Sequence, residues 1–186
     1  MDFPSPSLPA PPVLTPFHPD SIGLVAVSAL ANAVIGQTAS AAWLAANKAF
    51  FYPFTLTSPA VAYQLLFWVG ATSSGNIDVG IYDVQGNRIV SAGSTAMSAT
   101  VNTVQELNIT DTQLMPGSYL LAVACDNTTG TCYRVNGADE FGLPSYPVYE
   151  EAGLTAAALP NPATPVISTE ANASIYVCGI QFRSVF

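Results

Sequence analysis

From about residue 49 onward, apolar and polar residues alternate in a way that predicts β-strands rather than helices. Residues 61–69 carry apolar side chains on both faces of a strand, which is typical of a strand in the middle of a sheet. In residues 76–83, three aliphatic residues alternate with polar and small ones. This second pattern predicts a half-buried strand whose other face, including Asp78 and Tyr82, meets solvent.

Further strands are expected where short apolar runs are separated by turn residues, at 88–91, 103–109, 118–125, 131–135 and 174–182. The turn residues between Asp83 and Asn87 indicate a hairpin. Short strands separated by frequent turns are typical of a sandwich or barrel. We therefore predict an all-β fold, a jelly-roll-like antiparallel β-sandwich of roughly eight strands.

The N-terminal third of the chain is less regular. Residues 22–46 are ambiguous, because their alanine and leucine favour helix while their valine and isoleucine favour strand. The apolar stretch 22–36 is short for a membrane span, is interrupted by Ser28 and Asn32, and follows no lysine or arginine. We expect no signal peptide and no transmembrane segment.

Residues 1–20 form a separate region, which we expect to be an extended arm in front of a single sandwich domain at 21–186. Its seven prolines oppose both helix and strand pairing. An extended segment with recurring apolar side chains gains stability by laying them on another surface. The predicted partner-binding residues are Phe3, Leu8, Val13, Leu14 and Phe17. A disordered tail is the alternative.

A second proline-rich region interrupts the sandwich at residues 136–173. It shows no clear period, so we expect a long loop insert. Loops of this length usually carry a function or belong to an interface.

Composition narrows the possible functions. Charged residues make up 9% of the 186 residues, and 4 basic against 12 acidic side chains give a net charge of −8. This balance argues against nucleic acid or an anionic membrane as a partner. The hydrophobic content of 50% excludes disorder throughout the chain. With so few charges, we expect part of the apolar surface to be covered in an assembly, with copies of this chain among the partners.

Three cysteines, Cys125, Cys132 and Cys178, cannot all pair within one chain. A hairpin turning at Thr128 and Thr129 would place Cys125 opposite Cys132, where a disulfide is one possibility. Free buried cysteines are the favoured alternative.

The residue types in this sequence offer little support for a catalytic site. His18 is the sole histidine and lies in the proline-rich arm, so a nucleophile would lack an oriented base. Carboxylate pairs for glycoside hydrolysis would have to come from Asp78, Asp83, Asp126, Asp139, Glu140, Glu150 and Glu151. Most of these are expected to serve turns. The oxygen-rich segments 83–87 and 126–131 lack the spacing of a calcium-binding EF-hand loop. We expect no enzyme activity, no cofactor and no metal.

Several segments resemble a recurrent β-sandwich module of tailed-bacteriophage virion proteins, cyanophages included. They are ANKAFFYPFTL (46–56), SGNIDVGIYDVQGNR (74–88), the SAGST run (91–95) and ITDTQLMPGSYLLAVACDNTTGTCYR (109–134). The resemblance covers roughly residues 44–135 and the final strand, and it rests on turns and strand ends. The arm and the proline-rich insert lie outside it.

The resemblance implies a non-enzymatic virion component, often a capsid decoration (cement) protein or a tail-associated protein. We therefore expect a protein on the outside of the head, assembled in the host cytoplasm, with the major capsid protein and its own copies as partners. Three-fold positions of a capsid offer symmetric sockets, which suggests a homotrimer. The rival hypothesis is a receptor-binding or carbohydrate-binding module. Its sugar platform would use Tyr146 and Tyr149 of the insert, whereas Trp68 is expected in the core.

Overall fold

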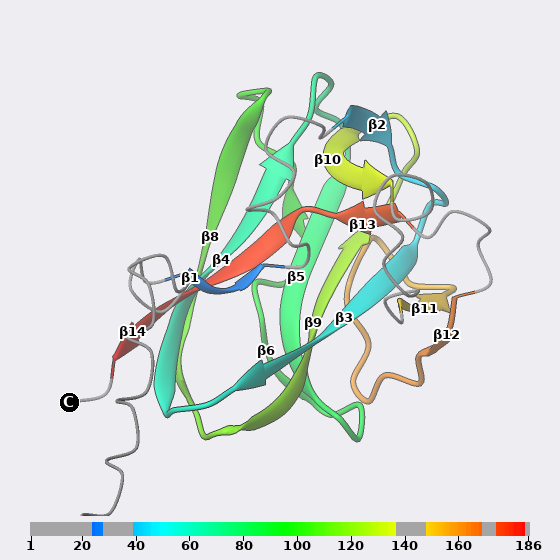
Figure 1. Cartoon of the computed structure of the whole chain (residues 1–186). Helices are drawn as coiled ribbons and strands as arrows, with labels where there is room; N and C mark the ends of the chain where they lie inside the picture. The colour runs from blue at the N-terminus through cyan, green and yellow to red at the C-terminus, as the bar shows by residue number, and fades with distance from the viewer. Residues whose placement is uncertain (1–23, 28–38, 137–147, 169–173, 185–186) are drawn as a thin grey trace, which may run out of the picture.

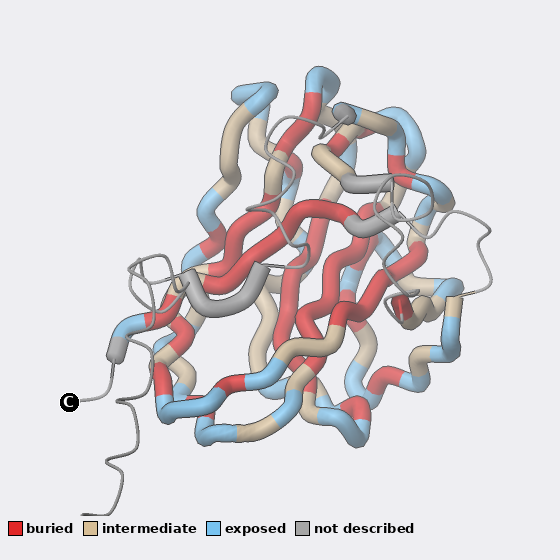
Figure 2. The backbone as a smooth tube through the Cα atoms, in the orientation of Figure 1, coloured by how far each residue is buried: buried red, intermediate tan, exposed pale blue. Residues whose placement is uncertain are grey.

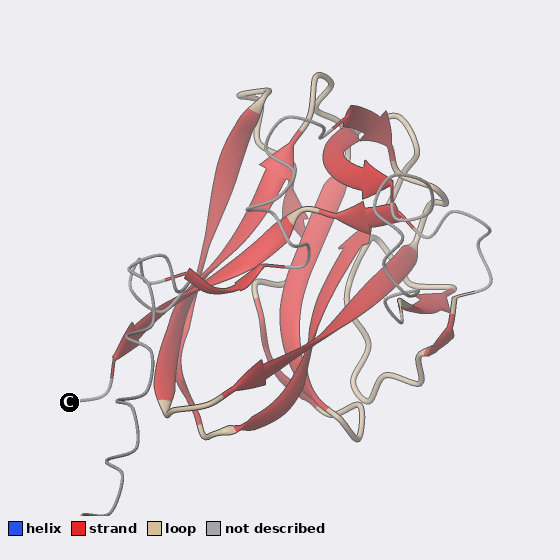
Figure 3. Cartoon of the chain, viewed as in Figure 1, coloured by secondary structure: helices blue, strands red, loops and turns tan. Residues whose placement is uncertain are grey.

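The computed structural model of the chain describes residues 24–27, 39–136, 148–168 and 174–184. All regular structure in these residues is β-strand, arranged as two antiparallel sheets that face each other (Figures 1 and 3). The predicted β-sandwich is therefore confirmed. The jelly-roll subtype stays a prediction, and the N-terminal arm with its five anchor residues lies outside the described residues.

The first sheet, sheet A, contains seven strands: β1 (Leu24–Val27), β2 (Ala39–Ala42), β4 (Ala60–Val69), β8 (Thr103–Leu114), β10 (Thr131–Asn136), β13 (Ser174–Tyr176) and β14 (Cys178–Ser184). Strand β4 lies between β14 and β8 and pairs with both along most of its length. This confirms the central position that its two apolar faces predict.

The second sheet, sheet B, also contains seven strands: β3 (Lys48–Leu56), β5 (Asn76–Asp83), β6 (Arg88–Ser91), β7 (Thr95–Ala96), β9 (Gly117–Cys125), β11 (Tyr149–Ala152) and β12 (Val166–Ile167). Strand β9 lies between β3 and β5, and β12 forms an edge beyond β11. The β5–β6 hairpin has the predicted antiparallel pairing, with Tyr82 opposite Arg88.

The main core fills the space between the sheets (Figure 2). Sheet A contributes Leu65 and Phe67, and sheet B contributes Phe50 and Val123, all with no exposed surface. Burial of one such side chain stabilises the fold by about 1.5–3 kcal/mol. Because both sheets supply large apolar residues along their inner faces, the sandwich needs no disulfide to hold its layers together.

Aromatic residues close one end of this core. Trp43 stacks on Tyr176 with ring centroids 3.9 Å apart, and Phe50 packs edge-on against Trp43 at 5.4 Å. The Tyr52 hydroxyl accepts a hydrogen bond from the backbone N–H of Tyr176 at 3.0 Å, which ties sheet B to sheet A. Burial, above all, raises the pKa of Tyr52 well above its ordinary value, so this hydroxyl stays protonated.

Strand prediction was accurate where alternation was strong. Strands β5 and β6 match the predicted 76–83 and 88–91, and β9 and β10 match to within one residue. The predicted strand 174–182 is divided into β13 and β14, and β8 runs to Leu114 rather than to residue 109. In the ambiguous stretch 22–46, the described parts 24–27 and 39–42 are strands. The expected number of roughly eight strands was too low, because several strands have only two to four residues.

The outer face of sheet B corrects two predictions. Asp78 and Tyr82 of β5 were expected to meet solvent, yet both are fully buried. The insert causes this burial, because its described part, residues 148–168, packs on sheet B. It contributes strands β11 and β12, and it places Leu159 on a second apolar cluster. The other members of this cluster are Ala49, Phe51, Tyr82, Leu120, Ala122, Ala124, Ala157 and Ala163.

Candidate functional site

The carboxylate of Asp83 holds the β5–β6 turn. It accepts hydrogen bonds from the backbone N–H groups of Gln85 and Asn87 at 2.9 and 2.8 Å, and from the Asn87 side chain at 2.7 Å. These bonds, led by the Asn87 side chain, lower the pKa of Asp83. Its oxygens are thus used by the turn, which confirms the structural interpretation of this segment.

Asp126 and Asn127 organise the connection from β9 to β10 in a similar way. Asp126 accepts hydrogen bonds from the Asn76 backbone N–H at 2.9 Å and from the Asn76 side chain at 2.7 Å. The Asn127 side-chain oxygen accepts from the N–H groups of Thr129 and Gly130, both at 2.9 Å. The segment 126–131 is therefore a turn held by its own polar side chains rather than an arrangement of free oxygen ligands.

Cys125 and Cys132 lie on strands that belong to different sheets. Strand β9 belongs to sheet B and β10 to sheet A, so the segment between them crosses the sandwich and does not form the hairpin that would pair these residues. Cys125, Cys132 and Cys178 are all buried, and none of them forms a disulfide within the described residues. Within the described part of the chain, no group of three or more histidine, cysteine, aspartate or glutamate side chains is placed to hold a metal ion.

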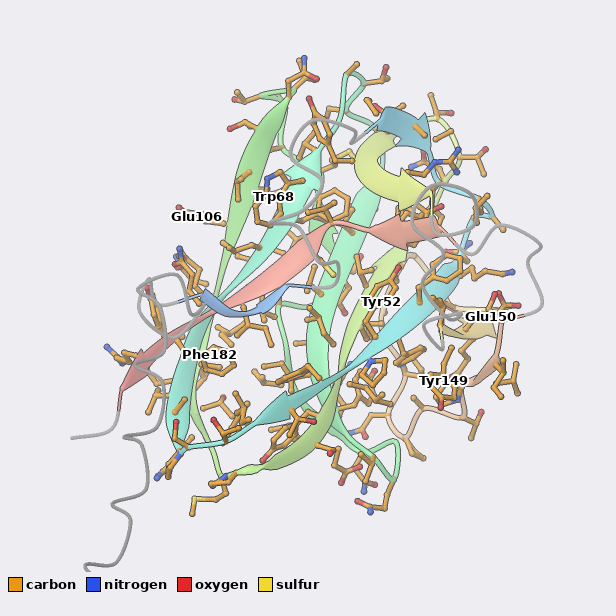
Figure 4. The ribbon with its side chains drawn as sticks, viewed as in Figure 1. Tyr52, Trp68, Glu106, Tyr149, Glu150 and Phe182 are labelled. Atoms are coloured by element: carbon orange, nitrogen blue, oxygen red, sulfur yellow. The ribbon has the colours of Figure 1, made fainter. Side chains whose placement is uncertain are left out.

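Two glutamates of β11 anchor the insert. Glu150 forms an ion pair with Lys48 at 3.2 Å and accepts a hydrogen bond from the Ser168 hydroxyl at 2.6 Å. Glu151 accepts a hydrogen bond from the backbone N–H of Thr164 at 2.8 Å. Their neighbour Tyr149 is half-buried and packs against the second apolar cluster (Figure 4). Tyr149 thus packs on sheet B, and Tyr146, Asp139 and Glu140 lie outside the described residues.

The structure also overturns the role that the sequence analysis expected for Trp68. Along β4, Leu65 and Phe67 point into the core, so Trp68 points to the outer face of sheet A, where it is half-buried and belongs to neither apolar cluster. The expected core role for Trp68 is wrong. A strand with apolar residues on both faces gives no signal of which face remains accessible, so the pattern could not reveal this position.

A row of polar side chains lies beside Trp68 on the same face. Gln64 of β4 donates hydrogen bonds to Glu106 at 3.3 Å and to Asn108 at 3.0 Å, both on β8. Residues paired across antiparallel strands share a face, and Trp68 pairs with Val104, one row from Glu106 (Figure 4). We call Gln64, Trp68, Glu106 and Asn108 the polar strip.

The edge of sheet B exposes an apolar pair. Val166 and Ile167 of β12 are 62% and 67% exposed, the largest exposures among the large apolar residues described. Strand β12 pairs with β11 on one side and is the terminal strand of the sheet. Exposed apolar side chains on an edge strand are a recurrent feature of surfaces that bind other chains.

Comparison with known proteins gives no assignment. No family model, no curated protein and no solved structure matches this chain. Among the described residues, no helix is long and apolar enough to cross a membrane.

Proposed function

We propose that this chain is a non-enzymatic structural protein of a tailed-phage virion, a decoration protein that binds the outside of the head and stabilises it. Its partners are the major capsid protein and copies of itself, in a homotrimer. The proposal draws on the resemblance of residues 44–135 to virion β-sandwich modules and on a charged content of only 9%. The β-sandwich fold is compatible with this role and does not distinguish it from others.

The observation that carries the proposal is the exposed pair Val166 and Ile167 on β12. Water around two adjacent apolar side chains is displaced when a partner covers them, at about 25 cal/mol per Å² of apolar surface. The neighbouring polar groups of the insert are already occupied, since Glu150 and Glu151 bond within the chain. A partner could therefore bind this edge through apolar contacts without having to carry a complementary charge.

Particle binding tests this role. Phage particles lacking the chain would be incubated with purified protein, sedimented and quantified for occupancy. We expect saturable binding by the wild type and at least a tenfold loss of affinity for the Val166→Ser, Ile167→Ser double variant. Val84→Ser is the matched control, because Val84 is similarly exposed at 57% but lies in the β5–β6 turn. Absence of the protein from purified virions would refute the proposal.

The N-terminal arm has its own test within this proposal. Deleting residues 2–17 removes Phe3, Leu8, Val13, Leu14 and Phe17. We expect particle occupancy to fall while the β-sheet circular dichroism and the melting temperature of the domain stay nearly unchanged. Full occupancy by the truncated chain would show that the sandwich makes the contact without the arm.

The polar strip supports a second candidate function, binding of carbohydrate. Sugars present an apolar ring face that stacks on an indole and hydroxyl groups that bond amides and carboxylates. Trp68 supplies the first kind of group, and Gln64, Glu106 and Asn108 supply the second. This arrangement would suit a receptor-binding module.

Glycan-array screening followed by calorimetry tests the second function. We expect Trp68→Ala and Glu106→Gln to abolish any binding found for the wild type. Tyr133→Ala, which changes a half-buried aromatic residue on β10, is the control expected to keep it. Equal binding by the wild type and Trp68→Ala would exclude the polar strip as the site.

A further inference from the structure

The described part of the insert contains a segment that is fastened across the outer face of sheet B. We call residues 154–164 the clamp segment; it follows β11 on the right of Figure 1. Leu159 lies at its middle and is buried, with 2% of its surface exposed. A Cβ added to Gly80 of β5 would lie 2.9 Å from the Leu159 side chain, so glycine at this position lets the segment approach the sheet closely.

Hydrogen bonds from sheet B hold the middle of the clamp segment. Arg88 donates to the Leu159 carbonyl at 2.5 Å, and Tyr82 donates from its hydroxyl to the Pro160 carbonyl at 2.5 Å. Farther along, the Ala163 N–H donates to the Gly86 carbonyl at 2.8 Å. None of these three contacts depends on a group that titrates near neutral pH.

A fourth contact at the middle of the clamp segment involves a buried carboxyl group. The backbone N–H of Leu159 donates to Oδ2 of Asp78 at 3.1 Å, beneath the clamp segment. Asp78 has no exposed surface, and its Oδ1 has no hydrogen-bond partner among the described residues. An ionised carboxylate at such a position has fewer well-aligned donors than water would supply, so its charge is less well solvated while the segment is closed.

The charged surroundings of Asp78 compensate this loss only in part. Burial raises the pKa of Asp78 to about 6, while backbone N–H groups, that of Leu159 above all and also those of Gly93 and Val79, and the positive charge of Arg88 oppose the rise. Tyr82 also lies at this site, and burial raises its pKa so that it stays neutral. Glu151 acts on Tyr82 and also accepts a hydrogen bond from the Thr164 N–H at the end of the clamp segment, while the segment itself, LTAAALPNPAT, contributes no titratable side chain. Asp78 is the carboxyl group that is fully buried beneath the middle of the segment.

We propose that Asp78 makes the clamp segment an acid-strengthened latch, in which protonation of the carboxyl group holds residues 154–164 against sheet B and ionisation favours their release. Release hydrates the carboxylate and uncovers the apolar outer face that includes Phe51, Leu120 and Ala122. The latch is independent of the proposed virion role, because it follows from contacts within one chain.

The direction of the effect follows from proton linkage. A carboxyl group whose pKa is raised in the closed state favours closure most below its ordinary value near 4, and this contribution is lost as the pH rises through about 6. A shift of about two pKa units corresponds to at most about a hundredfold change in the opening equilibrium across this window.

Hydrogen exchange of the Leu159 amide in the full-length protein tests the latch. Exchange would be followed by NMR from about pH 4 to about pH 8 and corrected for the intrinsic rate. We expect the protection of Leu159 in the wild type to fall by up to about a hundredfold between about pH 4 and about pH 6, and to level off above that range. In Asp78→Asn, the side-chain oxygen can still accept from Leu159, and we expect protection to be independent of pH. Asp111→Asn, at an exposed position of β8 in sheet A, is expected to behave like the wild type.

Two results would overturn the latch: pH-independent protection of Leu159 in the wild type, or unchanged pH dependence in Asp78→Asn. If Asp78→Asn does not fold, the carboxyl carbon of Asp78 in the wild type can be titrated by NMR. A midpoint near 6 together with loss of Leu159 protection between about pH 4 and about pH 6 would support the latch. A midpoint near 4 would exclude it.

Discussion

Gly75 lies directly against Asn127, because a Cβ added to Gly75 would be 1.6 Å from the Asn127 side-chain nitrogen. The same Asn127 nitrogen donates a hydrogen bond to the Ser74 carbonyl at 3.1 Å. The turn before β5 and the connection from β9 to β10 are therefore packed together at one end of the sandwich. Gly75 also has a φ of +75°, a conformation that side chains disfavour.

Gly75→Ala is expected to destabilise the protein by about 3 kcal/mol or more, because steric overlap adds to the backbone strain. Gly93→Ala is the matched control: Gly93 has a φ of +74°, but a Cβ there would meet nothing within 4 Å. The control should lose about 1 kcal/mol from strain alone. Urea denaturation of both variants measures the difference, and equal losses would contradict the packing at Gly75.

Leu65→Ala is expected to lower the free energy of unfolding by about 2–5 kcal/mol, because it opens a cavity in the main core. Leu65 has no exposed surface, and its strand β4 is paired on both sides. Ile167→Ala, at a residue that is 67% exposed, should change stability by less than about 0.5 kcal/mol. Similar effects of the two substitutions in denaturation curves would be incompatible with this core.

The three cysteines are expected to react with a thiol reagent only when the protein unfolds. All three are buried and form no disulfide in the described residues, and burial, above all, raises the pKa of both Cys125 and Cys132, which disfavours the reactive thiolate. A colorimetric assay should detect almost no fast reaction in the native state and three thiols per chain in concentrated guanidinium. Fewer than three in the unfolded, non-reduced protein would reveal a disulfide.

Asp126→Asn is expected to remove part of the acid sensitivity of the fold. Burial tends to raise the pKa of Asp126, but hydrogen bonds from Asn76 and Asn127 outweigh it and lower the pKa. A lowered pKa stabilises the folded state above the ordinary aspartate value of 3.8, and this contribution is lost as the pH falls below it. The variant should therefore be less stable than the wild type at neutral pH.

The stability difference between the wild type and Asp126→Asn should shrink as the solution is acidified to about pH 3. Denaturant midpoints measured at several pH values would show this convergence. For Asp78→Asn we expect the opposite pH dependence, because the raised pKa of Asp78 makes the folded wild type less stable as the pH rises toward about 6. A constant difference for Asp126→Asn at every pH would contradict the assigned shift.

The sequence by itself predicted the features that depend on neighbouring residues. Strong alternation located β5, and the Asp83 to Asn87 turn followed from side chains that bond their own backbone. The central position of β4 followed from its two apolar faces. These features are local, because strand period and turn chemistry act over a few residues.

The alternation of apolar and polar residues was a less reliable guide to side-chain direction where the pairing of two strands is irregular. The pairing of β4 with β8 shifts between Ala62 and Gln64, and Ala62 faces the core together with Leu65. The strict period would have placed these two residues on opposite faces. A bulge adds one residue to one strand, so the inward and outward faces exchange beyond it.

Only the tertiary structure decided which surfaces are covered. Asp78 is buried because the clamp segment, far away in sequence, packs on sheet B. Trp68 is half-buried because its face of sheet A lies outside the main core, and Cys125 and Cys132 belong to different sheets because the chain crosses the sandwich between them. Such burial depends on contacts between distant segments, and the free energy of those contacts leaves no periodic signal in the local sequence.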